Sequence, residues 1–490
     1  MRLLYCFLVN PAPSRLVLSD LGLLSILSGL VMAKCSHLTE CHGRGLVIVS
    51  ASFVIHLLIT AITRCTGVLF SSFQNEFLST AAQTGAISSI MSASSFFGST
   101  LGGVLENRFG CRITAFIGGL LNIAGMLGCA LTRNIYQMYV TGALAGLGNG
   151  ISYVSAVVIV AQYFKKYYSI AASFMTTGDS VGIMMFGPLM HLLLSTYGWR
   201  GTLVVTCAIT ANICVAGAVC RPNRQSSLYR GRNFRDGYRS TNESGNGDEE
   251  QDLTVQANET RRDSSERRAD TWNSFRFAGI MSRIAEMLRL NILWQSYRFS
   301  MFCFTQCAYI ISLGCYLIYL VPRATTSGVP DEKAALLLSV IGIGGLVGRP
   351  FCGVINRKVP SVIIYDASIL TGGCAVLMAQ FGTYGHFVAS AAVFGLAVGF
   401  QRTISPVLIR EYVGTDNLGS AVGLYSGFGG VADLIGPILA GALYDAIESY
   451  SVLFYFFAGI FFTGFVGMLF TPLLKRIEPG VRTKGNATNI

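Results

Sequence analysis

Long apolar stretches separated by short polar segments recur along almost the whole chain. A helix that crosses the hydrocarbon core of a bilayer needs about 20 predominantly apolar residues, and stretches of that length cover residues 46–70, 112–131 and 451–470. The pattern therefore predicts an all-α integral membrane protein with twelve transmembrane helices, the remaining nine being centred near residues 94, 150, 180, 209, 310, 343, 371, 398 and 430.

Polar segments divide the chain into domains. Residues 221–290 are polar and rich in Arg, Ser, Asn and Glu around their centre, which is typical of a disordered cytoplasmic linker. On either side we expect a six-helix bundle, at residues 46–220 and 291–475, followed by a cytoplasmic tail at 476–490. The apolar part of residues 1–45 leaves three alternatives open, a cleaved signal, an extra span or an interfacial helix, and this segment stays unassigned.

An internal repeat relates the two bundles. Short segments match at one shared offset of 249 positions, and a shared register is more informative than any single match. The pairs include Gly146-Leu147-Gly148 with Gly395-Leu396-Ala397, Asn107-Arg108 with Asn356-Arg357, and Gly187-Pro188 with Gly436-Pro437. Two parallel six-helix pseudo-repeats are typical of secondary transporters, in which substrate binds near the bilayer midplane between the halves.

Composition agrees with a membrane protein. The chain is 52% hydrophobic and 12% charged, with a mean hydropathy of +0.54, whereas soluble domains carry roughly a quarter charged residues. The net charge of +11 comes from basic residues beside the predicted spans rather than in one stripe, so we expect a lipid bilayer and no nucleic acid as a partner.

The basic residues also predict an orientation, because cytoplasmic loops carry an excess of Lys and Arg. The richer side should be cytoplasmic, which places both termini there, and we expect a multi-pass protein of the plasma membrane. The richer set comprises Arg108, Arg112, Lys165, Lys166, Arg357, Lys358, Arg410, Lys475, Arg476, Arg482 and Lys484, and the other set Arg133, Arg200, Arg323 and Lys333.

The sequence lacks the motifs of several classes of enzyme and channel. The fourteen cysteines fall mainly inside the spans and show no metal-ligand spacing. The chain also lacks a Gly-Lys-Ser/Thr phosphate loop, a His-Glu-x-x-His zinc motif and a potassium-filter sequence. We therefore expect no enzyme activity, no catalytic residue, no cofactor and no metal.

Charged residues inside the spans point to the substrate site, because a charge at mid-bilayer is costly and normally faces a cavity or a partner. Three arginines, Arg64, Arg349 and Arg402, would suit an anionic or zwitterionic solute, since guanidinium binds carboxylate through two parallel hydrogen bonds. Asp179 and Asp433 supply the opposite sign as coupling or structural acids. Structural Arg–Asp pairing between helices and snorkelling remain alternatives.

Four polar residues are predicted to line the same site. Thr60 lies one helical turn from Arg64, and Asn149, Ser152 and Tyr153 lie in the fourth span, beside the position that the repeat relates to Arg402. With the three arginines they form the predicted substrate-binding set.

Sequence motifs resemble the monocarboxylate transporter family of the major facilitator superfamily over roughly residues 43–475. The motifs are Tyr163-Phe164-Lys165-Lys166 followed by Gly178, Asn107-Arg108-Phe109-Gly110-Cys111-Arg112, Arg349-Pro350, and Ser420-Ala421-Val422-Gly423-Leu424 followed by Tyr444-Asp445. The resemblance implies a major facilitator fold and transport of a small carboxylated solute by alternating access. Some members need a single-span immunoglobulin-type accessory glycoprotein, so such a partner is a further expectation.

Arg64 narrows the resemblance to one branch of the family. Many members have lysine at this position, and in its arginine the chain resembles the branch associated with creatine- or carnitine-like solutes. Other positions depart from the family. The family's signature at the first helix is reduced here to Cys41-His42-Gly43-Arg44-Gly45-Leu46, and Gly345 stands where proton-coupled members carry an aspartate.

If neither Asp179 nor Asp433 faces the cavity, transport should depend little on a proton gradient, and Asp433→Asn should retain most activity.

A sensor or receptor that uses a transporter fold without transport is the alternative, with the long linker as its signalling part. Deleting residues 226–270 separates the two hypotheses, since a transporter should keep uptake and a sensor should lose signalling while binding persists.

Overall fold

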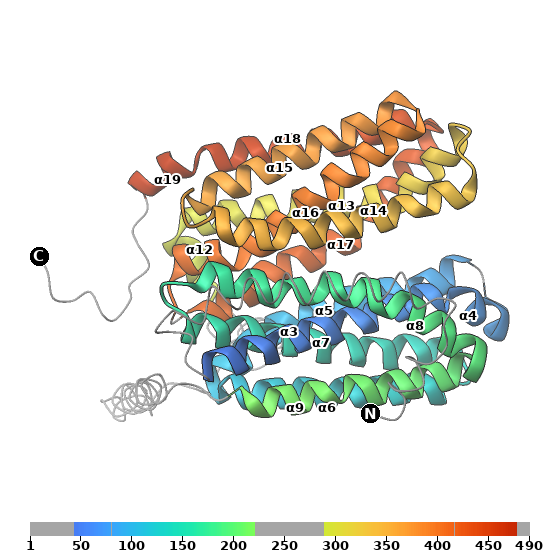
Figure 1. Ribbon diagram of the computed structural model, residues 1–490, viewed down its shortest axis with the longest axis horizontal. Helices are drawn as coiled ribbons and strands as arrows, with labels where there is room; N and C mark the ends of the chain where they lie inside the picture. Colours follow the sequence, from blue (N-terminus) through green and yellow to red (C-terminus); the bar gives the residue numbers. More distant parts are fainter. Residues whose placement is uncertain (1–43, 80, 221–288, 416, 478–490) are drawn as a thin grey trace, which may run out of the picture. The chain divides into compact units, whose positions relative to one another are not determined.

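The computed structural model describes residues 44–79, 81–220, 289–415 and 417–477, which are helical almost throughout and contain no strand (Figure 1). Nearly all of the predicted N-terminal segment, linker and C-terminal tail lies outside these described residues. The described residues from Val49 onward belong to one compact unit, which contains the interactions of the candidate site.

The first half of the chain forms long helices joined by short turns. The longest of them, α8, is broken at Gly198, whose φ of 67° lies in the left-handed region that favours glycine, and it continues toward α9. The helices are α3 (Arg44–Val68), α4 (Phe70–Phe77), α5 (Ala81–Phe109), α6 (Cys111–Leu131), α7 (Ile135–Tyr163), α8 (Tyr168–Thr210) and α9 (Asn212–Val219).

The second half repeats this pattern of long helices. Its elements are α12 (Asn291–Gln295), α13 (Tyr297–Thr326), α14 (Asp331–Ile355), α15 (Ser361–Met378), the 3-10 turn η2 (Ala379–Phe381), α16 (Tyr384–Val413), α17 (Leu418–Ile447), α18 (Tyr450–Leu469) and α19 (Thr471–Ile477).

Nine helical stretches in the described part of the chain are long and apolar enough to cross a membrane. They confirm an all-α membrane protein. The predicted number of twelve additionally needs α3, α5 and the part of α8 before Leu189, which do not belong to these nine. The exact number of spans therefore stays a prediction.

Local sequence explains where several helices begin. Asn134 caps α7 by accepting a hydrogen bond from the backbone N–H of Tyr136 through its side chain, and Ser296 caps α13 in the same way for Phe299. These side chains satisfy N–H groups that have no partner within the helix. Asn134 ends the short turn between α6 and α7, whereas Ser296 is the single residue between α12 and α13.

Glycines let the helices pack closely, and they do so in the repeat register. A Cβ atom at Gly146 or Gly150 of α7 would collide with the backbone of α5, at Met91 and Ser95 respectively. Their counterparts 249 positions later, Gly395 and Gly399 of α16, would collide with the backbone of α14. Small residues at such crossings allow backbone-to-backbone approach.

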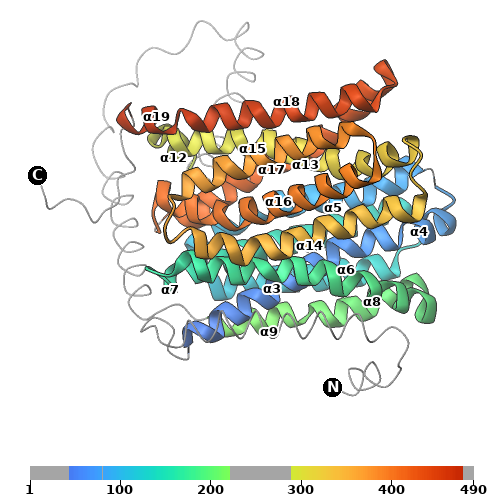
Figure 2. The ribbon, with the colours of Figure 1, turned by 45° about the horizontal axis from the view of Figure 1, so that its top comes forward.

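Two pairs of helices make most of the contact between the halves. Helix α5 of the first half packs against α17 of the second, and α8 packs against α14 (Figure 2). The repeat relates these two interfaces, since α5 corresponds to α14 in sequence and α8 to α17. Any side chain at the centre of these interfaces can therefore contact both halves.

Candidate functional site

A buried ion pair joins the halves at the interface of α8 and α14. Arg349 of α14 is only 6% exposed, and its Nη1 lies 3.4 Å from Oδ2 of Asp179 on α8. The same nitrogen donates a hydrogen bond to the carbonyl oxygen of Thr176, also on α8. The sequence analysis singles out Arg349 and Asp179 independently as charges inside the membrane. In the structure the charge of each compensates that of the other, as expected in a medium of low dielectric constant.

Helix α3 completes the surroundings of Asp179. The hydroxyl of Thr60 lies 3.2 Å from Oδ1 of Asp179 and 3.0 Å from the carbonyl oxygen of His56. The fully buried His56 has its Nδ1 3.0 Å from the carbonyl oxygen of Ser52, and its ring centroid is 5.2 Å from that of Tyr153 on α7. Helices α3, α7, α8 and α14 therefore meet around one carboxylate.

Arg402 of α16 adds a second guanidinium to this cluster. It is partly buried and interacts electrostatically with Tyr309, Tyr153, Tyr425 and Asp179. The repeat relates Tyr153 to Arg402 and Thr60 to Tyr309. We call Thr60, Tyr153, Asp179, Tyr309, Arg349 and Arg402 the central cluster.

The other predicted site residues have different places. Arg64 lies on α3, but its side chain is outside the described part of the structure, so its role stays a prediction. Asn149 accepts a hydrogen bond of 3.0 Å from Asn122 of α6, and Ser152 lies where a Cβ at Gly118 of α6 would collide with its hydroxyl. The structure thus places Asn149 and Ser152 in the α6–α7 interface.

Asp433 lies in the other interface between the halves. Its Oδ2 accepts a hydrogen bond of 2.7 Å from Ser92 on α5. Asp433 therefore links α17 to α5, whereas Asp179 links α8 to α14. The two acids are in different inter-half contacts.

Sequence reasoning missed Thr176, Tyr309 and His56. Tyr309 had a usable signal, because it lies 249 positions after Thr60. Thr176 acts through its backbone carbonyl, which side-chain identity cannot reveal. A single histidine on an apolar helix is ordinarily a core residue, and His56 gives no sequence signal of its own; in the structure it is fully buried against Tyr153 of the central cluster.

The two halves meet closely at one end, which we call the basic end and define as the end where α5, α7, α14 and α16 finish. Asn107 of α5 donates to Ser420 of α17 at 2.5 Å, and its repeat counterpart Asn356 donates to Ser169 of α8 at 3.0 Å. Arg410 donates to the carbonyl oxygen of Phe164 at 2.7 Å. Hydrogen bonds therefore join the two halves at this end.

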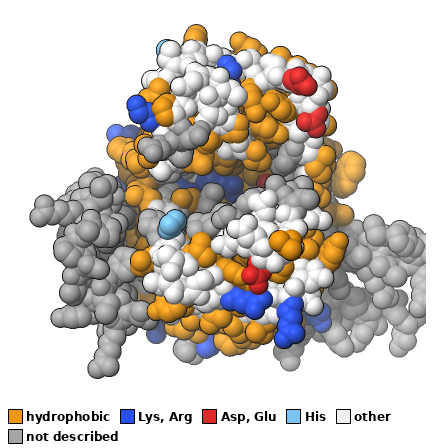
Figure 3. Space-filling model, turned by 90° about the vertical axis from the view of Figure 1, so that its right-hand side faces the viewer, with side chains coloured by type: hydrophobic (Ala, Val, Ile, Leu, Met, Phe, Trp, Pro, Cys, Tyr) orange, Lys and Arg blue, Asp and Glu red, His pale blue; other side chains and the backbone are white. Residues whose placement is uncertain are grey.

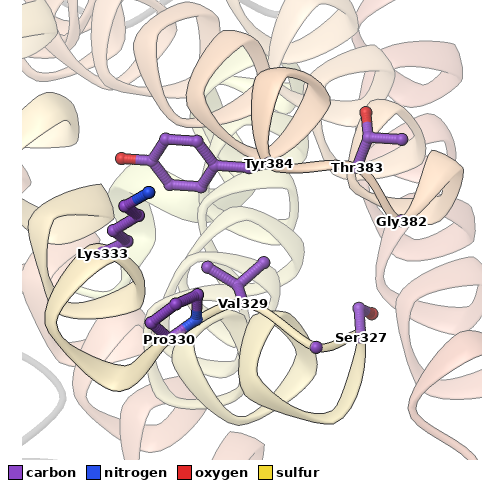
Figure 4. A pocket seen from close by; sticks show the side chains of 8 residues that line it. Ser327, Val329, Pro330, Lys333, Gly382, Thr383 and Tyr384 are labelled. Carbon is purple, nitrogen blue, oxygen red and sulfur yellow. The ribbon is translucent and has the colours of Figure 1, made fainter.

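The opposite end looks different. Figure 3 views it directly and shows basic side chains recessed near the middle of the face. A separate cavity of about 270 Å³ lies at this end between the turns that precede α14 and α16 (Figure 4). It is lined by Ser327, Gly328, Val329, Pro330, Lys333, Gly382, Thr383 and Tyr384, and none of these belongs to the central cluster.

Comparisons with known proteins agree with this architecture. The family profile described as Major Facilitator Superfamily matches residues 52–378 and 362–489. Monocarboxylate transporter 12 of Mus musculus is 28% identical over 449 residues, covering 89% of this chain and 87% of the relative. Monocarboxylate transporter 14 of Homo sapiens is 27% identical over 489 residues, with 90% and 92% covered.

Solved structures share the fold at low sequence identity. The proton:xylose symporter XylE bound to 6-bromo-6-deoxy-D-glucose superposes with a TM-score of 0.65 and 14% identity, over 89% of this chain and 99% of that structure. The transporter FucP in the outward conformation gives a TM-score of 0.59 and 16% identity, over 87% and 99%. The chain belongs to the major facilitator superfamily, and within it resembles the monocarboxylate transporters.

Proposed function

We propose that this membrane protein is a secondary transporter or facilitator that moves a small carboxylated solute, either a monocarboxylate or a zwitterion such as creatine or carnitine. The observation that carries the proposal is the pair of guanidinium groups, Arg349 and Arg402, at the junction of helices from both halves. Arginine binds carboxylate through a planar two-pronged contact, and the contact strengthens in a site from which water is excluded.

The arrangement of the helices supports alternating access. Polar contacts close the basic end, while the recessed basic side chains face the opposite end (Figure 3). A solute bound at the central cluster would touch both halves, so its binding could favour their rotation about the site. Arg349, Arg402, Tyr153 and Thr60 are the proposed contacts, together with Arg64 from α3.

Orientation and partners are part of the proposal. The basic end carries Lys165, Lys166, Arg357 and Lys358, which favours a cytoplasmic position for that end and for both termini. We propose the plasma membrane as the location. An immunoglobulin-type accessory protein is expected only from the family resemblance, and co-purification of the tagged chain from cells would identify it.

The test is uptake by oocytes or reconstituted vesicles with a panel of monocarboxylates, creatine, carnitine and aromatic amino acids. We expect saturable uptake of at least one carboxylated member and no uptake of its amide analogue, because the amide lacks the negative charge that the arginines recognise. Absence of uptake for every member, in protein shown to reach the membrane, would refute the proposed substrate class.

A further inference from the structure

The ion pair between Arg349 and Asp179 is unusual in its placement, because each partner belongs to a different half of the protein. The Arg349 side chain is 7% exposed and the Asp179 side chain 25% exposed. A charge taken out of water is costly unless an opposite charge compensates it. Each half thus contributes one charge that the other half needs.

The contacts that Arg349 makes with α8 use only one of its guanidinium nitrogens. The ion pair to Asp179 and the hydrogen bond to Thr176 both use Nη1, whereas the buried Nε has no hydrogen-bond partner among the described residues. A guanidinium normally offers two parallel N–H groups to a carboxylate. The contact with Asp179 therefore leaves donor capacity that a better placed carboxylate can use.

Asp179 is the more accessible partner and has other groups around it. Its second oxygen lies 3.2 Å from the hydroxyl of Thr60. The charged and titratable side chains that interact with it come from four helices: His56 of α3, Tyr153 of α7, Arg349 of α14 and Arg402 of α16. When Asp179 leaves Arg349, it retains Thr60 and lies within electrostatic reach of Arg402.

We propose that Asp179 is the counter-ion of Arg349 in the empty transporter and that the carboxylate of the solute takes its place when the solute binds. This inference rests on the proposed transport function. It assigns Asp179 a positioning role, because Asp179 acts on the solute through Arg349. The exchange of one carboxylate for another keeps Arg349 paired in both the empty and the loaded protein.

The pairing matters most while the empty protein changes conformation. Net transport requires the empty form to return through a state in which the site is closed to both sides, where an unpaired guanidinium would be most costly. Exchange of external for internal solute uses only the loaded form. Asp179 should therefore be needed for net transport and much less for exchange.

The experiment uses the full chain reconstituted in liposomes, with a solute identified in the uptake panel. In Asp179→Asn we expect net uptake into empty vesicles to fall by about tenfold or more, since removing one partner of a buried pair is strongly destabilising. Exchange into solute-loaded vesicles should stay within about threefold of wild type, because the loaded form keeps its own carboxylate. Asp179→Glu should restore net uptake, and Asp433→Asn is the matched control.

Three transport results would overturn the inference. Unchanged net uptake in Asp179→Asn would show that Arg349 needs no internal counter-ion. An equal loss of net uptake and exchange would indicate a purely structural role. Collapse of wild-type net uptake by a proton uncoupler, together with uptake in Asp179→Asn that the uncoupler does not change, would show that Asp179 exchanges a proton rather than an ion-pair partner.

A second measurement is independent of the solute. Arg349→Gln leaves the Asp179 carboxylate without its partner, so its thermal unfolding midpoint should be lower than that of the double variant Arg349→Gln/Asp179→Asn. If Asp179→Asn shifts the midpoint equally in the wild type and in Arg349→Gln, the two side chains are not energetically coupled. This result stands even if wild type transports none of the panel, so failure of the proposed function and failure of the ion-pair inference remain distinguishable.

Discussion

At the scale of single residues, Arg349 is the residue on which the proposed function most depends. It lies almost fully buried between the halves, with Asp179 as its ion-pair partner and Thr176 as its hydrogen-bond acceptor. A guanidinium in such a place is costly to retain for packing alone, because a well-packed apolar side chain of similar volume is often equally stable. This cost agrees with the proposed role of Arg349 in binding a carboxylated solute.

Arg349→Gln should reduce uptake of carboxylated solutes by about 30-fold or more, since truncating one partner of a buried charge pair costs 2–5 kcal/mol. Arg349→Lys should recover little of it, because an ammonium group cannot form the planar two-pronged contact. Initial rates of uptake, normalised to surface protein, test both statements. Full activity in Arg349→Gln would exclude Arg349 from solute binding.

At the scale of helices, close packing depends on a few glycines rather than on glycine in general. Gly150 of α7 faces the backbone of α5 with no room for a side-chain carbon, whereas Gly142 on the same helix has open space at its Cβ position. The four-residue spacing that they share with Gly146 therefore does not by itself identify the close contacts.

This contrast supplies a matched pair of substitutions. Gly150→Ala should destabilise the protein by about 1–3 kcal/mol or more, because overpacking moves the backbone of α5. Gly142→Ala should be neutral or slightly stabilising, since alanine favours helix. The thermal unfolding midpoints of the two purified variants test this expectation. Equal midpoints would contradict the close packing of α7 against α5 at Gly150.

At the scale of the whole molecule, the repeat organises the contacts between the halves. Thr100 and Arg349 are 249 positions apart, and each donates a side-chain hydrogen bond to a backbone carbonyl across the interface, at Gly423 and Thr176 respectively. Asn107 and Asn356 are related in the same way at the basic end. The two interfaces between the halves are thus built alike.

Replacing both asparagines by alanine should weaken closure of the basic end, because each substitution removes one hydrogen bond between the halves. In this background, a cysteine at Ser173, a buried position on α8 packed against Gly353, should react faster with an impermeant maleimide added from the basic side. We expect an increase of about threefold. Asn122→Ala, which removes a buried asparagine within the first half, is the control and should leave labelling unchanged.

Much of the architecture could be predicted from sequence because it depends on properties that act along the chain. Apolar stretch length predicts membrane-crossing helices, the common offset predicts two halves, and the cost of a buried charge singles out Arg349, Arg402 and Asp179. These arguments need no knowledge of how the helices are rotated about their axes.

Tertiary structure decided what depends on that rotation. Successive residues of a helix point about 100° apart, so Ser152 lies against α6 while its neighbour Tyr153 lies beside His56 and Arg402. For the same reason, the sequence could name Asp179 and Asp433 as intramembrane acids but could not choose between them as the partner of Arg349. Only the packing of α8 against α14 brings the Asp179 carboxylate to Arg349, while α17 turns Asp433 toward Ser92 of α5.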